Sequence, residues 1–189
     1  MGQLSLRELI LCALFVALVA VGALIRIPIG TDVFTLQFMF TLLAGLLLGP
    51  RLGATAVAVY ILLGLIGVPV FASGGGPGYI LQPTFGYLLG FVVQAWFCGW
   101  AARRGAVTFK RLLLINFGGM VIVYAFGLVW FYVISNYVID APVALYWVIL
   151  YCGILQIPPD ALLCVAAAAA AKRGLSAGIW LNPPRGTGK

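Results

Sequence analysis

Apolar stretches long enough to cross a lipid bilayer recur along the chain, and they constrain the fold more than any other feature. A spanning helix needs about 20 mainly apolar residues, because each residue advances it by about 1.5 Å across a hydrocarbon core of about 30 Å. Of the 189 residues, 64% are hydrophobic and only 8% are charged, whereas soluble domains carry about 25% charged residues. We therefore expect an all-α integral membrane protein that forms a single domain over residues 1–189.

Six of these stretches are expected to span the membrane. They run approximately over residues 8–26, 34–49, 52–71, 84–101, 111–135 and 158–172. The last belongs to an apolar run over 143–171 that is too long for one helix and contains Pro158 and Pro159. Proline is tolerated in the first turn of a helix but not in its middle, so we expect the sixth span to begin there. Residues 143–155 are rich in aromatic side chains and are expected to form a helix at the membrane surface.

The basic residues indicate how these helices are oriented. Six spans place both termini on one side of the membrane, and of the 11 Lys and Arg residues only Arg26 falls on the other side. Basic loops face the cytoplasm, so both termini are expected to be cytoplasmic. The net charge of +7 is then a signal of topology and not of nucleic-acid binding. With this orientation, we expect three segments to face outward: the Arg26–Asp32 loop, a glycine-rich loop after residue 73, and the start of the last helix.

The glycine-rich loop separates the third and fourth expected membrane spans. It opens the stretch "GGGPGYILQPTFGYLLGF", residues 74–91. Backbone N–H groups of glycines, together with a helix N-terminus capped by Thr84, would suit an anion such as a carboxylate. No Gly-Lys-Ser/Thr follows, so the loop is not a P-loop. The alternative interpretation is a flexible connection between two helices.

Two polar side chains stand out within the apolar spans. Apart from Glu8, the first residue of the first span, Asp160 is the only acidic residue inside a spanning segment, and intramembrane carboxylates are costly enough to be functional hypotheses by default. Its alternative role is to complement the dipole of the helix that it begins. Gln37 lies early in the second span, where it can contact a ligand or bond to a neighbouring helix.

Catalytic and metal chemistry find no support in the sequence. There is no histidine, no paired carboxylates and no ATP-binding motif, and the four cysteines lie singly in apolar segments, as packing residues do. We expect neither an enzyme nor a resident cofactor or metal. If the protein moves a solute uphill, a partner or an ion gradient must supply the energy.

Small residues line one face of the first helix. In "ALFVALVAVGAL" they include Ala13 and Ala17, which have the spacing that lets helices approach closely in lipid. They can serve internal packing or the docking of another protein.

Several motifs together resemble the biotin transporter BioY family. The most specific are "LLAGLLLGPRLG", "LLGLIGVPVF", the glycine-rich loop and "PTFGYLLGF", all between Thr35 and Phe91. The likeness extends to "ALFVALVAV", which is similar to the alanine motif of S-components, and to "PPDALLC" at the last helix. The resemblance implies a six-helix S-component of an energy-coupling factor (ECF) transporter in a prokaryotic cell membrane. Such a subunit binds biotin from outside and pairs with a transmembrane coupling subunit and two ATP-binding cassette ATPases.

The resemblance also implies which residues act. Ala13 and Ala17 would dock on the coupling subunit. The implied ligand-contacting residues are Gln37, Gly74, Gly75, Gly76, Tyr79, Thr84, Tyr87 and Asp160. One departure concerns the last helix, where the family has a lysine three residues after the aspartate and this chain has Leu163. Asp160 must then be offset by ligand N–H donors or another helix, or be partly protonated.

Two other functions remain open. The chain can be an S-component for another small carboxylated metabolite, or a standalone facilitator. A facilitator needs a continuous polar path across the bilayer, and the inner parts of the second and sixth spans, such as 42–48 and 161–171, offer none.

Overall fold

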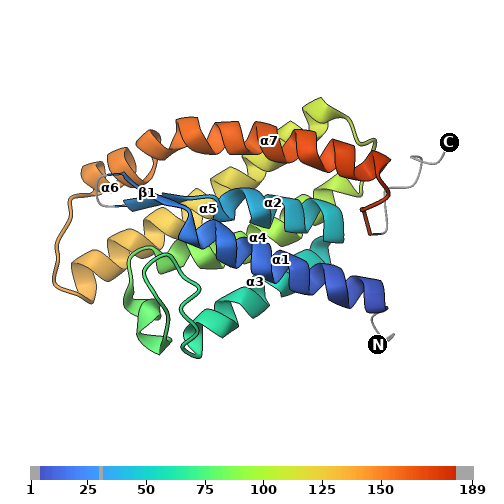
Figure 1. Cartoon of the computed structure of the whole chain (residues 1–189). Coiled ribbons are helices and arrows are strands. Elements are labelled where there is room, and N and C mark those ends of the chain that lie inside the picture. The colour runs from blue at the N-terminus through green and yellow to red at the C-terminus, as the bar shows by residue number, and fades with distance from the viewer. Residues whose placement is uncertain (1–4, 30–31, 182–189) are drawn as a thin grey trace.

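A computed structural model describes residues 5–29 and 32–181 of the chain. Helices follow one another through this part of the chain, interrupted by one two-stranded antiparallel hairpin (Figure 1). In order, the elements are α1 (Leu6–Leu24), β1 (Arg26–Ile29), β2 (Asp32–Thr35), α2 (Gln37–Leu48), α3 (Pro50–Leu65), η1 (Pro77–Leu81), α4 (Phe85–Ala102), α5 (Phe109–Tyr137), α6 (Leu145–Cys152), η2 (Ile154–Gln156) and α7 (Ile157–Ser176).

Several of these helices match the dimensions of a bilayer. By length and composition, the helical stretches able to cross one are Leu6–Leu24, Phe85–Ala102, Phe109–Tyr137 and Leu145–Ser176. The apolar helices α2 and α3 have 12 and 16 residues, which is about 18 and 24 Å against a hydrocarbon core of about 30 Å. The chain is thus a multi-pass membrane protein with four long candidate spans among its described residues.

The second expected span, 34–49, begins later than the sequence suggested. Its first residues lie in β2, which pairs with β1 in the register Arg26↔Thr35. The segment expected to be an Arg26–Asp32 loop is therefore mostly a hairpin, and it is the departure from an all-α fold in the part of the chain that the structure covers.

The third expected span, 52–71, ends early for a visible reason. Gly67 adopts φ +111°, which glycine tolerates and which breaks the helix. The chain then folds back so that Phe71, only 2% exposed, enters the core. A Cβ on Gly64 would lie closer than 3.0 Å to the ring of Phe71, so the ring fits only beside a glycine. The Phe71 ring lies 4.4 Å from that of Tyr79, which anchors the following loop to η1.

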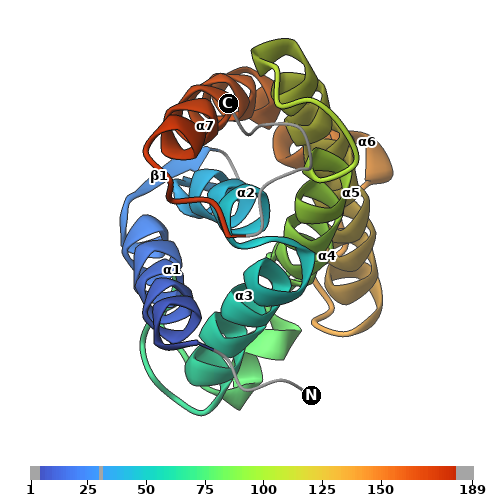
Figure 2. The same ribbon diagram turned by 90° about the vertical axis from the view of Figure 1, so that its right-hand side faces the viewer.

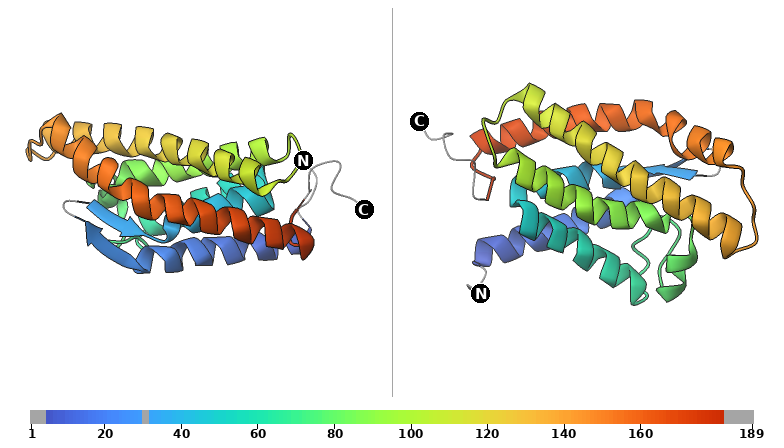
Figure 3. Two further views of the ribbon diagram at one scale, coloured as in Figure 1. Left: turned by 90° about the horizontal axis from the view of Figure 1, so that it is seen from above. Right: turned by 180° about the vertical axis from the view of Figure 1, so that it is seen from behind.

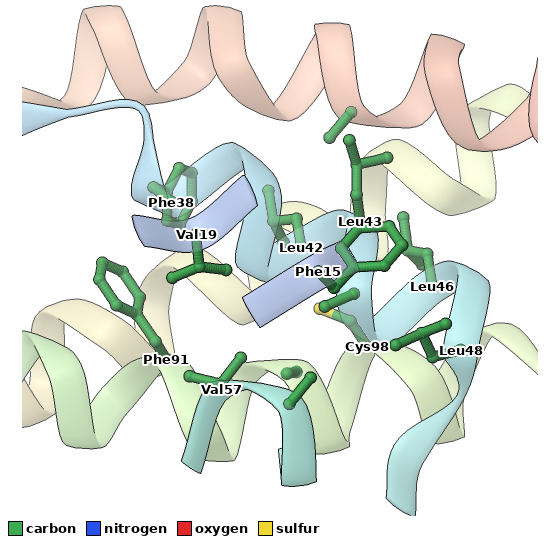
Figure 4. Close-up of a cluster of buried hydrophobic side chains, with 14 of the residues drawn as sticks. Phe15, Val19, Phe38, Leu42, Leu43, Leu46, Leu48, Val57, Phe91 and Cys98 are labelled. Carbon is green, nitrogen blue, oxygen red and sulfur yellow. The ribbon is translucent and has the colours of Figure 1, made fainter. Parts of the chain in front are cut away.

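Helix α2 forms the centre of the protein. Ten of its twelve residues are buried, and it contacts α1, α3, α4 and α7, which surround it when the molecule is viewed end-on (Figure 2). The hydrophobic cluster around it includes Phe15 and Val19 of α1, Val57 of α3 and Phe91 of α4 (Figure 4). Because its neighbours cover it, a helix this short is stable without spanning the full hydrocarbon thickness.

Close helix packing depends on small residues. A Cβ on Gly45 of α2 would lie closer than 3.0 Å to the carbonyl oxygen of Ala95 on α4, so these two helices touch through their backbones. Helices α4 and α5 lie side by side in opposite directions (Figure 3) and make the most extensive helix pair. These contacts hold α4, and with it one wall of the site described below.

The two ends of the molecule differ. At one end, the side chain of Arg7 in α1 donates a 2.5 Å hydrogen bond to the Gly178 carbonyl just after α7. At the other end lie the hairpin and α6 (Figure 1). The apolar run over 143–171 divides as expected, because α7 begins at Ile157 with its prolines in the first turn.

Candidate ligand-binding site

A cavity opens at the hairpin end of the molecule. Its empty space, including the open mouth, is about 610 Å³. It is lined by Phe34, Thr35, Gln37, Phe38, Ala72, Ser73, Tyr79, Thr84, Tyr87, Leu88, Phe91, Val123, Tyr124, Gln156 and Asp160.

Three helices begin at this cavity. Gln37 is the first residue of α2, Thr84 precedes α4 and Gln156 precedes α7. A helix N-terminus carries about half a positive charge. Their convergence makes the cavity favourable for an anionic group or for hydrogen-bond acceptors of a ligand.

Asp160 lies at the cavity and is only 5% exposed. The hydroxyl of Tyr124 on α5 donates a 2.7 Å hydrogen bond to its Oδ2 atom. A buried carboxylate is tolerated only when it is hydrogen-bonded or paired, and Tyr124 supplies one such hydrogen bond from another helix. Leu163, at the position of the family lysine, packs partly buried against the hydrophobic core and is not among the lining residues of this cavity.

Gln37 lies at the cavity and also makes the expected bond to a neighbouring helix. It lines the cavity and is 4% exposed. Its Nε2 donates a 2.5 Å hydrogen bond to the hydroxyl of Tyr60 on α3, which donates in turn to the Val70 carbonyl. The side chain thus faces the cavity while it connects α2 to the loop that follows α3.

Three more of the expected ligand-contacting residues line the cavity, namely Tyr79, Thr84 and Tyr87. Tyr79 is 8% exposed and comes from η1. The Tyr87 hydroxyl donates a 2.8 Å hydrogen bond to the carbonyl of Cys152, which ties α4 to α6. Thr84 precedes α4 as expected, but the expected capping bond is absent: its backbone is in the αR region, whereas a capping side chain normally requires an extended N-cap residue.

The glycines of the loop do not line this cavity. Within the described residues, the loop contributes Ala72 and Ser73 to its wall, and Gly74, Gly75 and Gly76 are absent from it. The sequence-based expectation that these glycines contact the ligand therefore has no geometric support.

Hydrogen bonds within the loop explain this difference. The N–H of Gly74 donates to the Phe71 carbonyl at 3.2 Å, and the N–H of Gly76 donates to the Gly64 carbonyl at 2.7 Å. These two N–H groups, which were expected to bind an anion, already have acceptors. The glycines instead serve the backbone, because Gly74 and Gly76 have φ of +111° and +108°.

Tyr124 and Gln156 are among the polar lining residues that were not anticipated as site residues, together with Thr35 and Ser73. Tyr124 places a hydroxyl within an otherwise apolar span, and Gln156 precedes Asp160 by four residues, which puts both on one helical face. Each carried a detectable signal, a polar group at membrane depth. Their approach to the site depends on how α5 and α7 pack, which local patterns do not encode.

The two alanines expected to dock on a partner, Ala13 and Ala17, lie outside the core. Ala13 and Ala17 are exposed, whereas Phe15 and Val19 form the buried face of the helix. In this chain alone, Ala13 and Ala17 therefore do not serve internal packing, one of their two expected roles.

Comparisons with known proteins agree with one another. The model of the BioY family matches residues 1–178. The "Probable biotin transporter BioY" of Lysinibacillus sphaericus is 42% identical over 172 residues, which cover 90% of this chain and 88% of the relative. The "Biotin transporter BioY" of Thermotoga maritima is 42% identical over 136 residues, covering 71% of this chain and 78% of the relative.

A solved structure has the same fold. It is described as the S-component for biotin from an ECF-type ABC transporter, and it matches with a TM-score of 0.78 and 26% sequence identity over 90% of this chain and 91% of that one. The match of a family model to nearly the whole chain, together with these relatives, establishes that the chain belongs to the BioY family.

Proposed function

We propose that this protein is the substrate-binding S-component of an ECF-type importer and that it captures biotin from outside a prokaryotic cell. The names of its relatives and the description of the matching structure support biotin as the ligand. The bacterial origin of those relatives supports the cytoplasmic membrane of a prokaryote as the location.

One observation carries the proposal: a buried carboxylate, Asp160, at the wall of a mostly apolar cavity. Biotin has two ureido N–H groups that can donate to a carboxylate, and a charge-assisted hydrogen bond is roughly twice as strong as a neutral one. Its thioether ring and tail need apolar walls. The side chains that provide them are Phe34, Phe38, Tyr79, Leu88, Phe91 and Val123.

The tail carboxylate of biotin needs a positive environment. With the N–H groups of Gly74 and Gly76 already bonded, we assign this role to the N-termini of α2 and α4. The hydroxyls of Ser73 and Thr84, which line the same cavity, add donors there.

We further propose six membrane crossings, formed by α1, α2, α3, α4, α5 and α7, with both termini in the cytoplasm. The distribution of basic residues supports this orientation. It puts the cavity on the outer side, where biotin arrives. The short helix α2 would cross inside the protein, where neighbouring helices and not lipid surround it. The short helix α3 would cross at the side of the bundle, with Val59 and Leu62 exposed to lipid.

The energy for uptake would come from partners. A transmembrane coupling subunit and two ATP-binding cassette ATPases would supply the ATP hydrolysis, and the protein itself would need no cofactor. The exposed residues Ala13 and Ala17 on α1 form the docking surface in this proposal.

A standalone facilitator is the less favoured function. It would need a polar path from the cavity to the opposite side of the membrane. The segments beyond the cavity are instead apolar and largely buried, as in Leu46–Leu48 of α2 and Ala167 and Ala168 of α7. An S-component for another small carboxylated metabolite shares all the features above and differs only in the ligand.

Calorimetric titration of biotin into the purified protein tests the proposal, with desthiobiotin and lipoate as competitors. Desthiobiotin keeps the cyclic urea and should compete, whereas lipoate lacks the urea and should not. Effective competition by lipoate would indicate a general carboxylate site. Absence of biotin binding would reject the ligand assignment.

A further inference from the structure

One amide at the cavity has no partner. Gln156 lines the cavity and is 6% exposed, and its Nε2 has no hydrogen-bond acceptor among the residues that the structure describes. A buried donor without an acceptor costs free energy, and such groups in native proteins usually mark a water, an ion or a ligand that completes them.

Gln156 and Asp160 present complementary groups side by side. They are four residues apart at the start of α7, so their Cβ atoms lie about 5–6 Å from each other on one helical face. Both line the same cavity. One offers an N–H donor and the other a carboxylate acceptor.

Three other polar side chains of the cavity already donate to protein acceptors. Tyr124 donates to Asp160, Gln37 to the Tyr60 hydroxyl and Tyr87 to the Cys152 carbonyl. Leu163 supplies no donor either, since its side chain is apolar. Gln156 therefore remains as an amide donor beside Asp160.

We propose that Gln156 is a specificity-determining residue whose Nε2 donates to the carbonyl oxygen of a cyclic urea, while Asp160 accepts from an adjacent ring N–H. This inference rests on the proposed function and names how the site distinguishes the urea. A cyclic urea carries its carbonyl acceptor directly next to an N–H donor, which matches the donor and the acceptor that this helix start presents.

The test compares two ligands that differ at one atom. Biotin has a carbonyl oxygen where protonated 2-iminobiotin has an =NH₂⁺ group, which donates and cannot accept. In Gln156→Leu, affinity for biotin should fall about tenfold, which corresponds to about 1.4 kcal/mol. Affinity for protonated 2-iminobiotin should fall less, because the Gln156 Nε2 donor has no acceptor on that ligand and only the amide oxygen can bond to it. In Gln156→Glu, the added acceptor should shift the preference toward 2-iminobiotin.

Gln94→Leu is the matched control. Gln94 is also buried with an unpartnered Nε2, but it lies on α4 and is not among the lining residues of the cavity. Its substitution should leave the ratio of the two affinities unchanged, whatever it does to thermal stability. If Gln156→Leu does not fold, Gln156→Glu provides the same comparison.

The outcomes separate the two proposals. Biotin binding by the wild type, with unchanged biotin affinity in Gln156→Leu or with equal losses for both ligands, would overturn the role of Gln156 and leave the proposed function intact. A wild type that does not bind biotin would reject the proposed function itself, and with it this inference.

Discussion

The hydroxyl of Tyr124 donates a 2.7 Å hydrogen bond to the carboxylate of Asp160. The two residues are 36 positions apart in the chain, one in the middle of α5 and the other in the first turn of α7. Both line the cavity. This bond holds the carboxylate in a defined orientation before a ligand arrives, so less ordering remains to be done on binding.

The first prediction concerns this pair. Asp160→Asn should fold normally and bind biotin about 10- to 100-fold more weakly, because a hydrogen bond to a charged group contributes about 1.5–3 kcal/mol. Tyr124→Phe should weaken binding less, by about tenfold. Titration calorimetry on both variants and on the double variant gives the coupling, which we expect to be favourable for residues in direct contact.

Asp160→Ala serves as the comparison for a purely structural role. If Asp160 only complements the dipole of α7, Asp160→Asn would bind biotin as tightly as the wild type, and Asp160→Ala would mainly lower the melting temperature. That result would contradict the ligand assignment.

The second prediction concerns the position of the Tyr87 ring. A Cβ on Gly127 of α5 would lie closer than 3.0 Å to this ring, so Gly127→Ala must push it within the cavity wall. Overpacking of this kind costs about 1–3 kcal/mol, and we expect weaker biotin binding together with a lower melting temperature.

Gly118→Ala on the same helix is the control for Gly127→Ala. Its Cβ would contact only the ring of Phe97, at 3.1 Å, and Phe97 is not a lining residue of the cavity. Equal affinity of the two variants for biotin would show that the Tyr87 ring does not shape the site.

The third prediction concerns the glycine-rich loop. A Cβ on Gly75 would lie closer than 3.0 Å to the Val68 carbonyl oxygen, so Gly75→Ala should displace the loop that carries Ala72 and Ser73. We expect slower or weaker binding in stopped-flow measurements with biotin. Gly78→Ala is matched to it, because a Cβ at that position meets open space. Equal binding kinetics in both variants would indicate that the loop only connects two helices and does not affect binding.

The fourth prediction concerns docking. Ala13→Trp and Ala17→Trp place a large side chain on an exposed face of α1, so they should leave biotin binding intact and abolish ATP-dependent uptake and co-purification with the coupling subunit. Val129→Trp is the control, since Val129 is 65% exposed on α5, and it should preserve uptake. Normal uptake by both α1 variants would exclude this face as the docking surface.

The fifth prediction concerns stability at the end opposite the cavity. The guanidinium of Arg103 donates to the carbonyls of Leu46, Leu47 and Leu181, and so connects the C-terminus of α2 to the segment after α7. Arg103→Ala should destabilise the protein by about 1–3 kcal/mol, because buried carbonyls lose their donor, without changing biotin affinity. A thermal melt decides this. Arg104→Ala is the control, as Arg104 is exposed and stacks on Trp100.

The sequence alone was sufficient for the general design. Hydrophobic runs of spanning length predict a helical membrane protein, and the prolines at 158 and 159 correctly located the start of α7. Asp160 stood out because any carboxylate in an apolar span is exceptional. These conclusions depend on composition and local propensity, which each segment carries by itself.

The boundaries of the second and third spans could not be found in the same way. Hydropathy measures only how apolar a segment is, so it could not separate β2 from α2. It also assigned residues 66–71 to a helix, although Phe71 folds back beneath Gly64. The start of α2 and the end of α3 both depend on which other segments of the chain pack against them.

The cavity residues also divide into those that the sequence predicted and those that only the tertiary structure revealed. Sequence identified Asp160 and Gln37 as polar groups at membrane depth, but only the packing of α5 against α7 brings Tyr124 to Asp160 and leaves the Gln156 amide facing the cavity. The loop glycines looked available for an anion until their N–H groups were found bonded to Phe71 and Gly64. Hydrogen-bond partners and cavity walls are relations between distant segments, so the tertiary structure decides them, whereas apolar length and a lone buried charge are properties of one segment, which sequence determines.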